Sequence, residues 1–214
     1  MKTTTTANKI IGAFKQHSLT AMLIAAMVMT GCDKDEDEEE PPVENEEEII
    51  TDVTLVFTNA NDANDVVKAK ATDDDGPGVN ELEVEDPINL DTSKTYNLTM
   101  EIFNSLESPA ENIGTEIAEE DDEHQIFFSF TPDAFATPVG NGNIDKASDA
   151  INYNDEDGNG NSLGLKTSWT TSSKVVSGGT FTVRLQHQPD VKTATSGASD
   201  GDTDFELEFV LNIK

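Results

Sequence analysis

Two histidines stand at the ends of segments in which apolar residues recur at every second position. His124 begins residues 124–131 and His187 ends residues 180–187, and each has the parity of the apolar residues in its segment. If the segments are neighbouring antiparallel strands, the start of one lies beside the end of the other, so the two imidazoles meet. Glu123 directly precedes His124, and because imidazole and carboxylate groups bind zinc and other transition metals, we predict a metal or ligand site at His124, His187 and Glu123. The alternative is that the histidines are polar side chains that close the core, each hydrogen-bonded to a loop.

A second candidate is the loop of residues 155–161 (DEDGNGN), in which oxygen-bearing side chains occur at alternate positions. The candidate ligands are Asp155, Asp157, Asn159 and Asn161. Gly160 takes the place of the invariant glycine of a calcium loop, but Lys166 stands where an EF-hand has its bidentate glutamate. The loop therefore predicts either a calcium site or, alternatively, a β-hairpin turn without metal. Residues 73–76 (DDDG) are a weaker version of the same pattern.

Two further features resemble functional motifs but favour structural interpretations. Residues 197–201 (GASDG) match the G-x-S-x-G nucleophile elbow, which needs a helix after it, whereas here a final alternating segment follows. Trp169 would suit a carbohydrate-binding platform, but packing in or beside the core is the favoured interpretation. We predict no catalytic residues and no enzyme activity.

The N-terminus has the composition of an export signal. Three lysines, at positions 2, 9 and 15, precede the apolar residues 19–29, a run shorter than the ~20 residues that span a bilayer but typical of a signal peptide. The run leads into Met29-Thr30-Gly31-Cys32, which resembles the lipobox of bacterial lipoproteins, where small residues precede an acylated cysteine. We therefore predict a signal peptide over residues 1–31 and a lipid anchor at Cys32 that holds the protein on a membrane. The alternative is an ordinary signal peptide followed by an incidental cysteine.

The remaining chain is strongly acidic. Loss of the three signal lysines changes the formal net charge from −30 to −33, which excludes nucleic acid as a partner because its phosphates would be repelled. Residues 33–48 hold eleven acidic residues and one lysine, and such a like-charge block is expected to stay extended and disordered. Residues 32–48 are therefore predicted to be a lipidated cysteine with an acidic tether. Because Cys32 is the only cysteine, the mature chain has no disulfide and depends on its core.

From residue 49 onward the apolar pattern has a period of two residues. It is clearest in residues 53–58, 96–103, 126–130, 181–185 and 205–213, and weaker strands are expected at residues 66–71, 88–90, 150–153 and 163–171. Turn-forming residues separate these stretches. The pattern predicts an all-β fold, a single antiparallel, Ig-like β-sandwich domain over residues 49–214. Residues 112–120 fit a helical turn or an irregular strand equally well.

Several stretches resemble lipoproteins of Bacteroidetes. Residues 33–37 (DKDED), directly after the cysteine, resemble the lipoprotein export signal that routes proteins to the outer face of the outer membrane; the alternative is the periplasmic face. Residues 107–113, 122–125 and 184–190 are similar to a group of small Bacteroidetes lipoproteins, some of which are labelled as having a type 1 periplasmic binding fold. That label implies a two-lobed α/β receptor, and the long amphipathic helices of such a receptor are not in this sequence. The resemblance implies an accessory role near TonB-dependent uptake and supplies no site residues.

Two functions are consistent with these observations. The first is a surface binding protein that captures a metal such as zinc, or another nutrient, for a TonB-dependent outer-membrane transporter. The second is a structural or adhesive surface protein stabilised by calcium. The distance between His124 and His187 discriminates between them, because the first function has no other named site.

Overall fold

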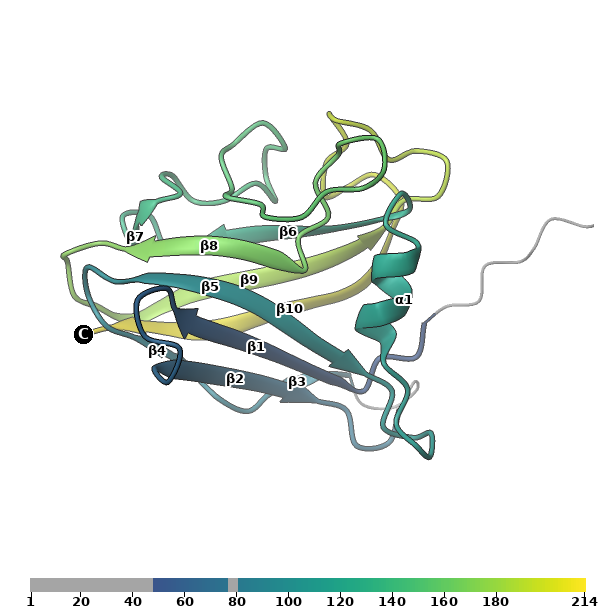
Figure 1. Cartoon of the computed structure of the whole chain (residues 1–214), viewed down its shortest axis with the longest axis horizontal. Coiled ribbons are helices and arrows are strands. Elements are labelled where there is room, and N and C mark those ends of the chain that lie inside the picture. The colour runs from purple at the N-terminus through teal and green to yellow at the C-terminus, as the bar shows by residue number, and fades with distance from the viewer. Residues whose placement is uncertain (1–47, 77–80) are drawn as a thin grey trace, which may run out of the picture. The chain divides into compact units, whose positions relative to one another are not determined.

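The structure, a computed structural model, describes residues 48–76 and 81–214, which form two facing β-sheets with a short helix at one end (Figure 1). The predicted all-β sandwich is thereby confirmed, whereas the predicted signal peptide, Cys32 and residues 33–47 of the predicted tether lie outside the described residues. In chain order the elements are β1 (Asp52–Asn59), β2 (Val66–Thr72), β3 (Glu83–Val84), β4 (Ile88–Leu90), β5 (Thr95–Phe103), α1 (Ile113–Glu119), β6 (His124–Phe130), β7 (Phe135–Thr137), β8 (Lys166–Thr171), β9 (Val176–His187) and β10 (Asp202–Ile213).

The strands are divided between a six-stranded sheet, in the order β3-β2-β1-β5-β8-β7, and a four-stranded sheet, in the order β4-β10-β9-β6. Neighbouring strands pair antiparallel, as predicted, except that β4 runs parallel to β10. In the four-stranded sheet β6 and β9 are direct neighbours. This adjacency was the condition on which the predicted meeting of the two histidines depended.

The core lies between the two sheets, where the alternate apolar side chains of each sheet meet those of the other. Part of the core is an aromatic cluster around Trp169, whose side chain is fully buried and whose Nε1 donates a hydrogen bond to Thr167 Oγ1 at 2.7 Å. The ring centroids of four phenylalanines lie 4.9–5.4 Å from that of Trp169: Phe128, Phe130, Phe135 and Phe181. Trp169 is thus a core residue, as favoured from the sequence, and not part of an exposed carbohydrate platform.

Helix α1 decides the ambiguity at residues 112–120. The Asn112 side chain caps the helix by accepting a hydrogen bond from the backbone N–H of Thr115 at 3.2 Å. Ile113 and Ile117 are four residues apart and therefore lie on one face, which is buried against the sandwich. A cap and an apolar pair are enough for a helix of this length only because the sandwich covers its apolar face.

The strands that the sequence analysis missed or misplaced are short or irregular. β3 and β7 are two and three residues long, too short to show an alternating pattern. Residues 150–153, predicted as a weak strand, are not one; Tyr153 makes an isolated bridge to Thr167, and its hydroxyl donates a hydrogen bond to the carbonyl of Ile126 at 2.7 Å. The Tyr153 side chain thus holds this loop against β6, where a regular strand would use backbone hydrogen bonds.

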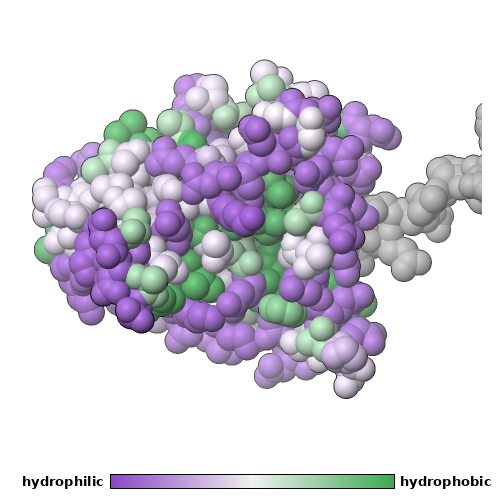
Figure 2. Space-filling model, viewed as in Figure 1, coloured by the Kyte–Doolittle hydropathy of each residue, from purple (hydrophilic) through white to green (hydrophobic). Residues whose placement is uncertain are grey.

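One end of the sandwich, here called the helix end, is formed by α1, residues 48–51, the starts of β6 and β10 and the end of β9 (Figure 1). Hydrophilic residues cover most of this end on the face shown in Figure 2. Within residues 48–76 and 81–214, none of the helical structure has the length and apolar character required to cross a membrane. The helix end brings together chain segments that are far apart in the sequence, and both predicted histidines lie there.

Candidate metal site at the helix end

The two predicted histidines meet at the helix end. His124 and His187 are paired in register in the β6–β9 ladder, and their rings stack with centroids 4.7 Å apart and planes inclined by 20°. The apolar residues that share their parity are paired in the same way, among them Ile126 with Leu185. Glu123, also predicted, places its Oε2 3.5 Å from His187 Nε2. The geometric prediction is therefore confirmed: both imidazoles and Glu123 lie together.

Stacking nevertheless prevents the two imidazoles from sharing one ion. The lone pair of an imidazole nitrogen lies in the ring plane, and two stacked planes inclined by only 20° intersect far beyond the ~2.1 Å of a zinc–nitrogen bond. Each ring instead faces its own carboxylate: His187 faces Glu123, and His124 faces Glu48, with 3.2 Å between His124 Nε2 and Glu48 Oε1. The pair does not have the arrangement of two ligands on one metal that the sequence analysis assumed.

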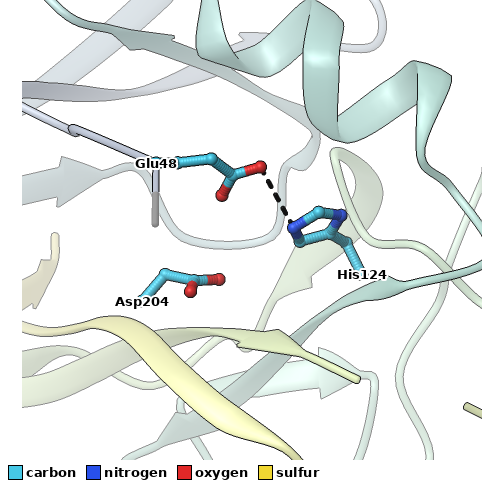
Figure 3. A group of neighbouring side chains, drawn as sticks. All are labelled: Glu48, His124 and Asp204. Atoms are coloured by element: carbon cyan, nitrogen blue, oxygen red, sulfur yellow. Dashed lines mark ion pairs between the residues drawn. The ribbon is translucent and has the colours of Figure 1, made fainter. Parts of the chain in front are cut away.

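A different set of side chains does converge. One ligand atom each from Glu48, His124 and Asp204 lie within 4.8 Å of one another, and the three side chains point toward a common centre (Figure 3). His124 and Asp204 come from the four-stranded sheet, whereas Glu48 precedes β1 of the six-stranded sheet. The cluster therefore bridges the two layers of the sandwich.

The backbone of β10 explains how Asp204 reaches this cluster. By alternation, Asp204 should face away from the core, because its neighbour Phe205 is buried. The register between β9 and β10 shifts between Thr203 and Phe205, so Asp204 is an extra residue in the ladder, a β-bulge that re-aims its side chain. Gly201 just before β10 adopts φ +81°, and a Cβ there would lie 2.0 Å from the carbonyl oxygen of His187. A glycine is thus required for β10 to begin close against the end of β9.

The ring of His124 is held in one orientation. Its side chain is 1% exposed, and its Nδ1 lies 3.2 Å from the carbonyl oxygen of Glu120, just after α1. Since a carbonyl only accepts, this contact is a hydrogen bond when Nδ1 carries the proton, which leaves Nε2 with its lone pair in the neutral ring. Nε2 has no aligned hydrogen bond to any described residue, although Glu48 lies within ion-pair distance. A buried nitrogen is thereby directed into a group of carboxylates.

The surroundings of His124 favour its charged form. Burial opposes protonation, but the Glu48 carboxylate, the Glu120 carbonyl and the charge of Asp204 outweigh it and raise the pKa of His124 above 6.5. The carboxylates thus stabilise positive charge at this point of the helix end.

The predicted calcium loop is an internally bonded turn. Asp157 Oδ1 accepts the backbone N–H groups of Asn159 and Asn161, each at 2.8 Å, and Asp157 Oδ2 accepts the side-chain amide of Asn161 at 3.0 Å. Asp155 accepts two further backbone N–H groups, those of residues 164 and 166, both at 2.9 Å. The predicted ligands Asp155, Asp157, Asn159 and Asn161 are close in sequence, but the two carboxyl groups already serve the turn. Calcium binding stays a prediction here, and the contacts favour the alternative, a turn without metal.

A buried lysine provides the cation at this turn. Lys192 Nζ lies 3.3 Å from Asp157 Oδ2, with the two side chains 1% and 0% exposed, and it also donates to the carbonyl of Asp121. Burial lowers the pKa of Lys192, whereas three N–H donors and the lysine together lower the pKa of Asp157 against the effect of burial. Lys192 thus joins three loops near the helix end, and nothing in the local sequence of the loop indicated it.

The remaining motifs take structural positions. Residues 197–201 form a turn in which Gly197 donates its N–H to Asp200 Oδ2 at 2.8 Å, and strand β10 follows where a nucleophile elbow needs a helix. In the segment 73–76, Asp73 Oδ1 accepts the backbone N–H groups of Asp75 and Gly76. Both stretches therefore use their polar side chains to form turns.

Comparisons with known proteins found no match to this chain among protein-family models, curated proteins or solved structures.

We expect the Lys192–Asp157 pair to be strongly coupled. Lys192→Met leaves a buried carboxylate without its cation and should lower the free energy of unfolding by about 3 kcal/mol or more in urea titrations. Adding Asp157→Asn removes that charge, so the double variant should lose less than the sum of the single losses. As a control, Lys174→Met breaks an exposed pair with Asp133 and should change little. Additive losses would show that the two side chains do not interact.

The raised pKa of His124 predicts a pH-dependent contribution to stability. A group whose pKa is higher in the folded state stabilises the fold fully below its unfolded value, near 6.5, and this contribution disappears as pH rises through the folded value. Wild type should therefore be most stable relative to His124→Gln below pH ~6.5, and the difference should shrink as the pH rises above that value. Urea unfolding in the presence of a metal chelator measures this difference. An advantage that grows with pH would contradict the assignment.

Proposed function

We propose that this protein is a lipid-anchored binding protein of the bacterial cell envelope that captures a divalent metal ion at the helix end and serves outer-membrane uptake. One observation carries the proposal: the buried His124, stacked on His187, directs a ring nitrogen toward the carboxylates of Glu48, which precedes β1, and Asp204 in β10. An imidazole among carboxylates is a donor set that transition-metal ions prefer.

The anchor is supported by the sequence. An apolar run that ends in Met29-Thr30-Gly31-Cys32, followed at once by acidic residues, fits a lipoprotein carried to the cell surface of a bacterium with an outer membrane. Glu48, the last residue of the acidic segment, belongs to the candidate site. A binding site beside the attachment of a tether suits a protein that holds its ligand near a membrane transporter, and a TonB-dependent transporter is the partner that the resemblance implies.

The alternative function has less support from the geometry. A calcium-stabilised structural or adhesive protein was motivated by residues 155–161, where hydrogen bonds and Lys192 already engage the carboxylates. An enzyme is not proposed either, because the serine motif lies in a turn that precedes a strand.

Zinc titration tests the capture function. We expect the wild-type protein to bind zinc in calorimetry, and the double variant His124→Gln, His187→Gln to bind it at least about tenfold more weakly, because it loses the imidazoles and keeps every acidic residue. Circular dichroism should show the same β-structure in both proteins. Equal affinities would place the zinc on the acidic surface and refute capture at the helix end.

Fractionation of cells tests the anchor. Cys32→Ala should release the protein from the membrane fraction or leave it unprocessed, because acylation takes place at this side chain. Neutralising Asp33, Asp35, Glu36 and Asp37 should leave membrane attachment intact and reduce digestion by protease added to whole cells. A Cys32→Ala protein that stays firmly in the membrane would refute the lipid anchor.

A further inference from the structure

The ligand atoms at the helix end belong to three separate parts of the chain. Glu48 lies before β1, His124 begins β6, and Asp204 occupies the bulge of β10 (Figure 3). Their side chains are at most partly exposed: Glu48 is 12% exposed, His124 1%, and Asp204 is of intermediate burial. Two carboxylates and one imidazole nitrogen are thus partly removed from water, where a cation is attracted more strongly than on the open surface.

We propose that Glu48, His124 and Asp204 are the protein ligands of a single divalent transition-metal ion, and that His187 and Glu123 position them without touching the ion. This inference rests on the proposed function and deepens it, since it assigns the ligands and the class of ion. It replaces the shared two-histidine site, which the stacked rings do not allow.

The ligand set selects the class of ion. Calcium and magnesium prefer oxygen ligands alone, whereas zinc and its first-row neighbours accept an imidazole nitrogen with carboxylate oxygens. Tetrahedral zinc with bonds of about 2.0–2.2 Å places its ligand atoms about 3.4 Å apart. The atoms here lie within 4.8 Å of one another, so rotations of the two carboxylate side chains can close the set. Three protein ligands leave a fourth position for water or for a group of a partner that receives the ion.

The surrounding contacts orient the central ligand. The Glu120 carbonyl accepts from His124 Nδ1 and so presents Nε2 to the ion, which is the usual way in which a second group orients a metal-bound histidine. His187 covers one face of the His124 ring, and Glu123 lies 3.5 Å from His187 Nε2. Their role is to keep the His124 ring in place between α1 and β9.

Binding at this site would also join parts of the fold that are otherwise separate. Glu48 leads into the six-stranded sheet, whereas His124 and Asp204 belong to the four-stranded sheet. An ion held by all three links the two sheets at the helix end and fixes the point where the acidic segment joins the domain. Metal that binds only the folded state stabilises it by RT ln(1 + L/Kd), where L is the free metal concentration, so the melting temperature rises as L exceeds Kd.

The test compares variants in which a proposed carboxylate ligand becomes an uncharged amide with a variant of His187, which stacks on His124. Glu48→Gln and Asp204→Asn keep the size of the side chains and remove one carboxylate each, whereas His187→Phe keeps a stacked ring and removes its nitrogens. In zinc calorimetry on the whole protein, each carboxylate variant should weaken binding by about tenfold or more, because it loses a ligand of the ion. His187→Phe keeps the stacked ring that positions His124 and should stay close to wild type. The zinc-induced rise in melting temperature should follow the same order, and excess calcium should not displace the zinc.

The outcomes separate this inference from the proposed function. One outcome overturns the ligand assignment but leaves zinc capture at the helix end intact. In that outcome His187→Phe weakens zinc binding as much as the double variant His124→Gln, His187→Gln does, whereas Glu48→Gln and Asp204→Asn leave it unchanged. If no variant changes the affinity, or if wild type does not bind zinc, both proposals are overturned.

Discussion

The in-register pairing of His124 with His187 in the β6–β9 ladder is the constraint on which the helix end depends. Directly opposite residues of an antiparallel pair bring their side chains within contact, and here the two rings stack at 4.7 Å. The stack buries His124 beneath His187, and the Glu120 carbonyl then fixes the remaining rotation of the ring. Its Nε2 is thereby directed toward Glu48 and Asp204. A shift of one residue in the ladder would turn His124 to the outer face and remove the cluster.

Buried carboxylates impose the second constraint, because an ionised group that leaves water needs a partner. The chain has 43 acidic residues and 13 lysines and arginines, so positive charge is scarce. At the turn of residues 155–161 the partner of Asp157 is Lys192, which belongs to a distant loop. At the helix end Glu48 has an imidazole, whose charge depends on pH, as its ion-pair partner. Asp157 therefore has a permanent cation beside it, and we interpret that pair as structural. Glu48 has only the imidazole of His124, and for this reason we propose that the cluster of Glu48, His124 and Asp204 binds an exchangeable cation.

The sequence predicted the features that alternation determines and missed those that break it. Parity placed His124 and His187 on the inward face, and strand polarity brought them together, as the structure shows. Parity could not find Asp204, since a β-bulge reverses the direction of its side chain. The sequence also did not indicate Glu48 as a ligand, because it lies in the acidic run of residues 33–48, which its composition predicts to be a tether. The sequence also could not predict that the rings of His124 and His187 stack instead of binding one ion together. Stacking depends on the side-chain rotations of the two rings, which a pattern of residue types does not determine.

The central claim is that one divalent metal ion lies among Glu48, His124 and Asp204. Crystals grown with zinc, with diffraction recorded on both sides of the zinc absorption edge, test it most directly because anomalous scattering locates the ion itself. The account predicts a single strong anomalous peak within about 2.2 Å of His124 Nε2 and of an oxygen from each carboxylate. A peak between His187 and Glu123, or peaks scattered only over surface acids, would contradict it.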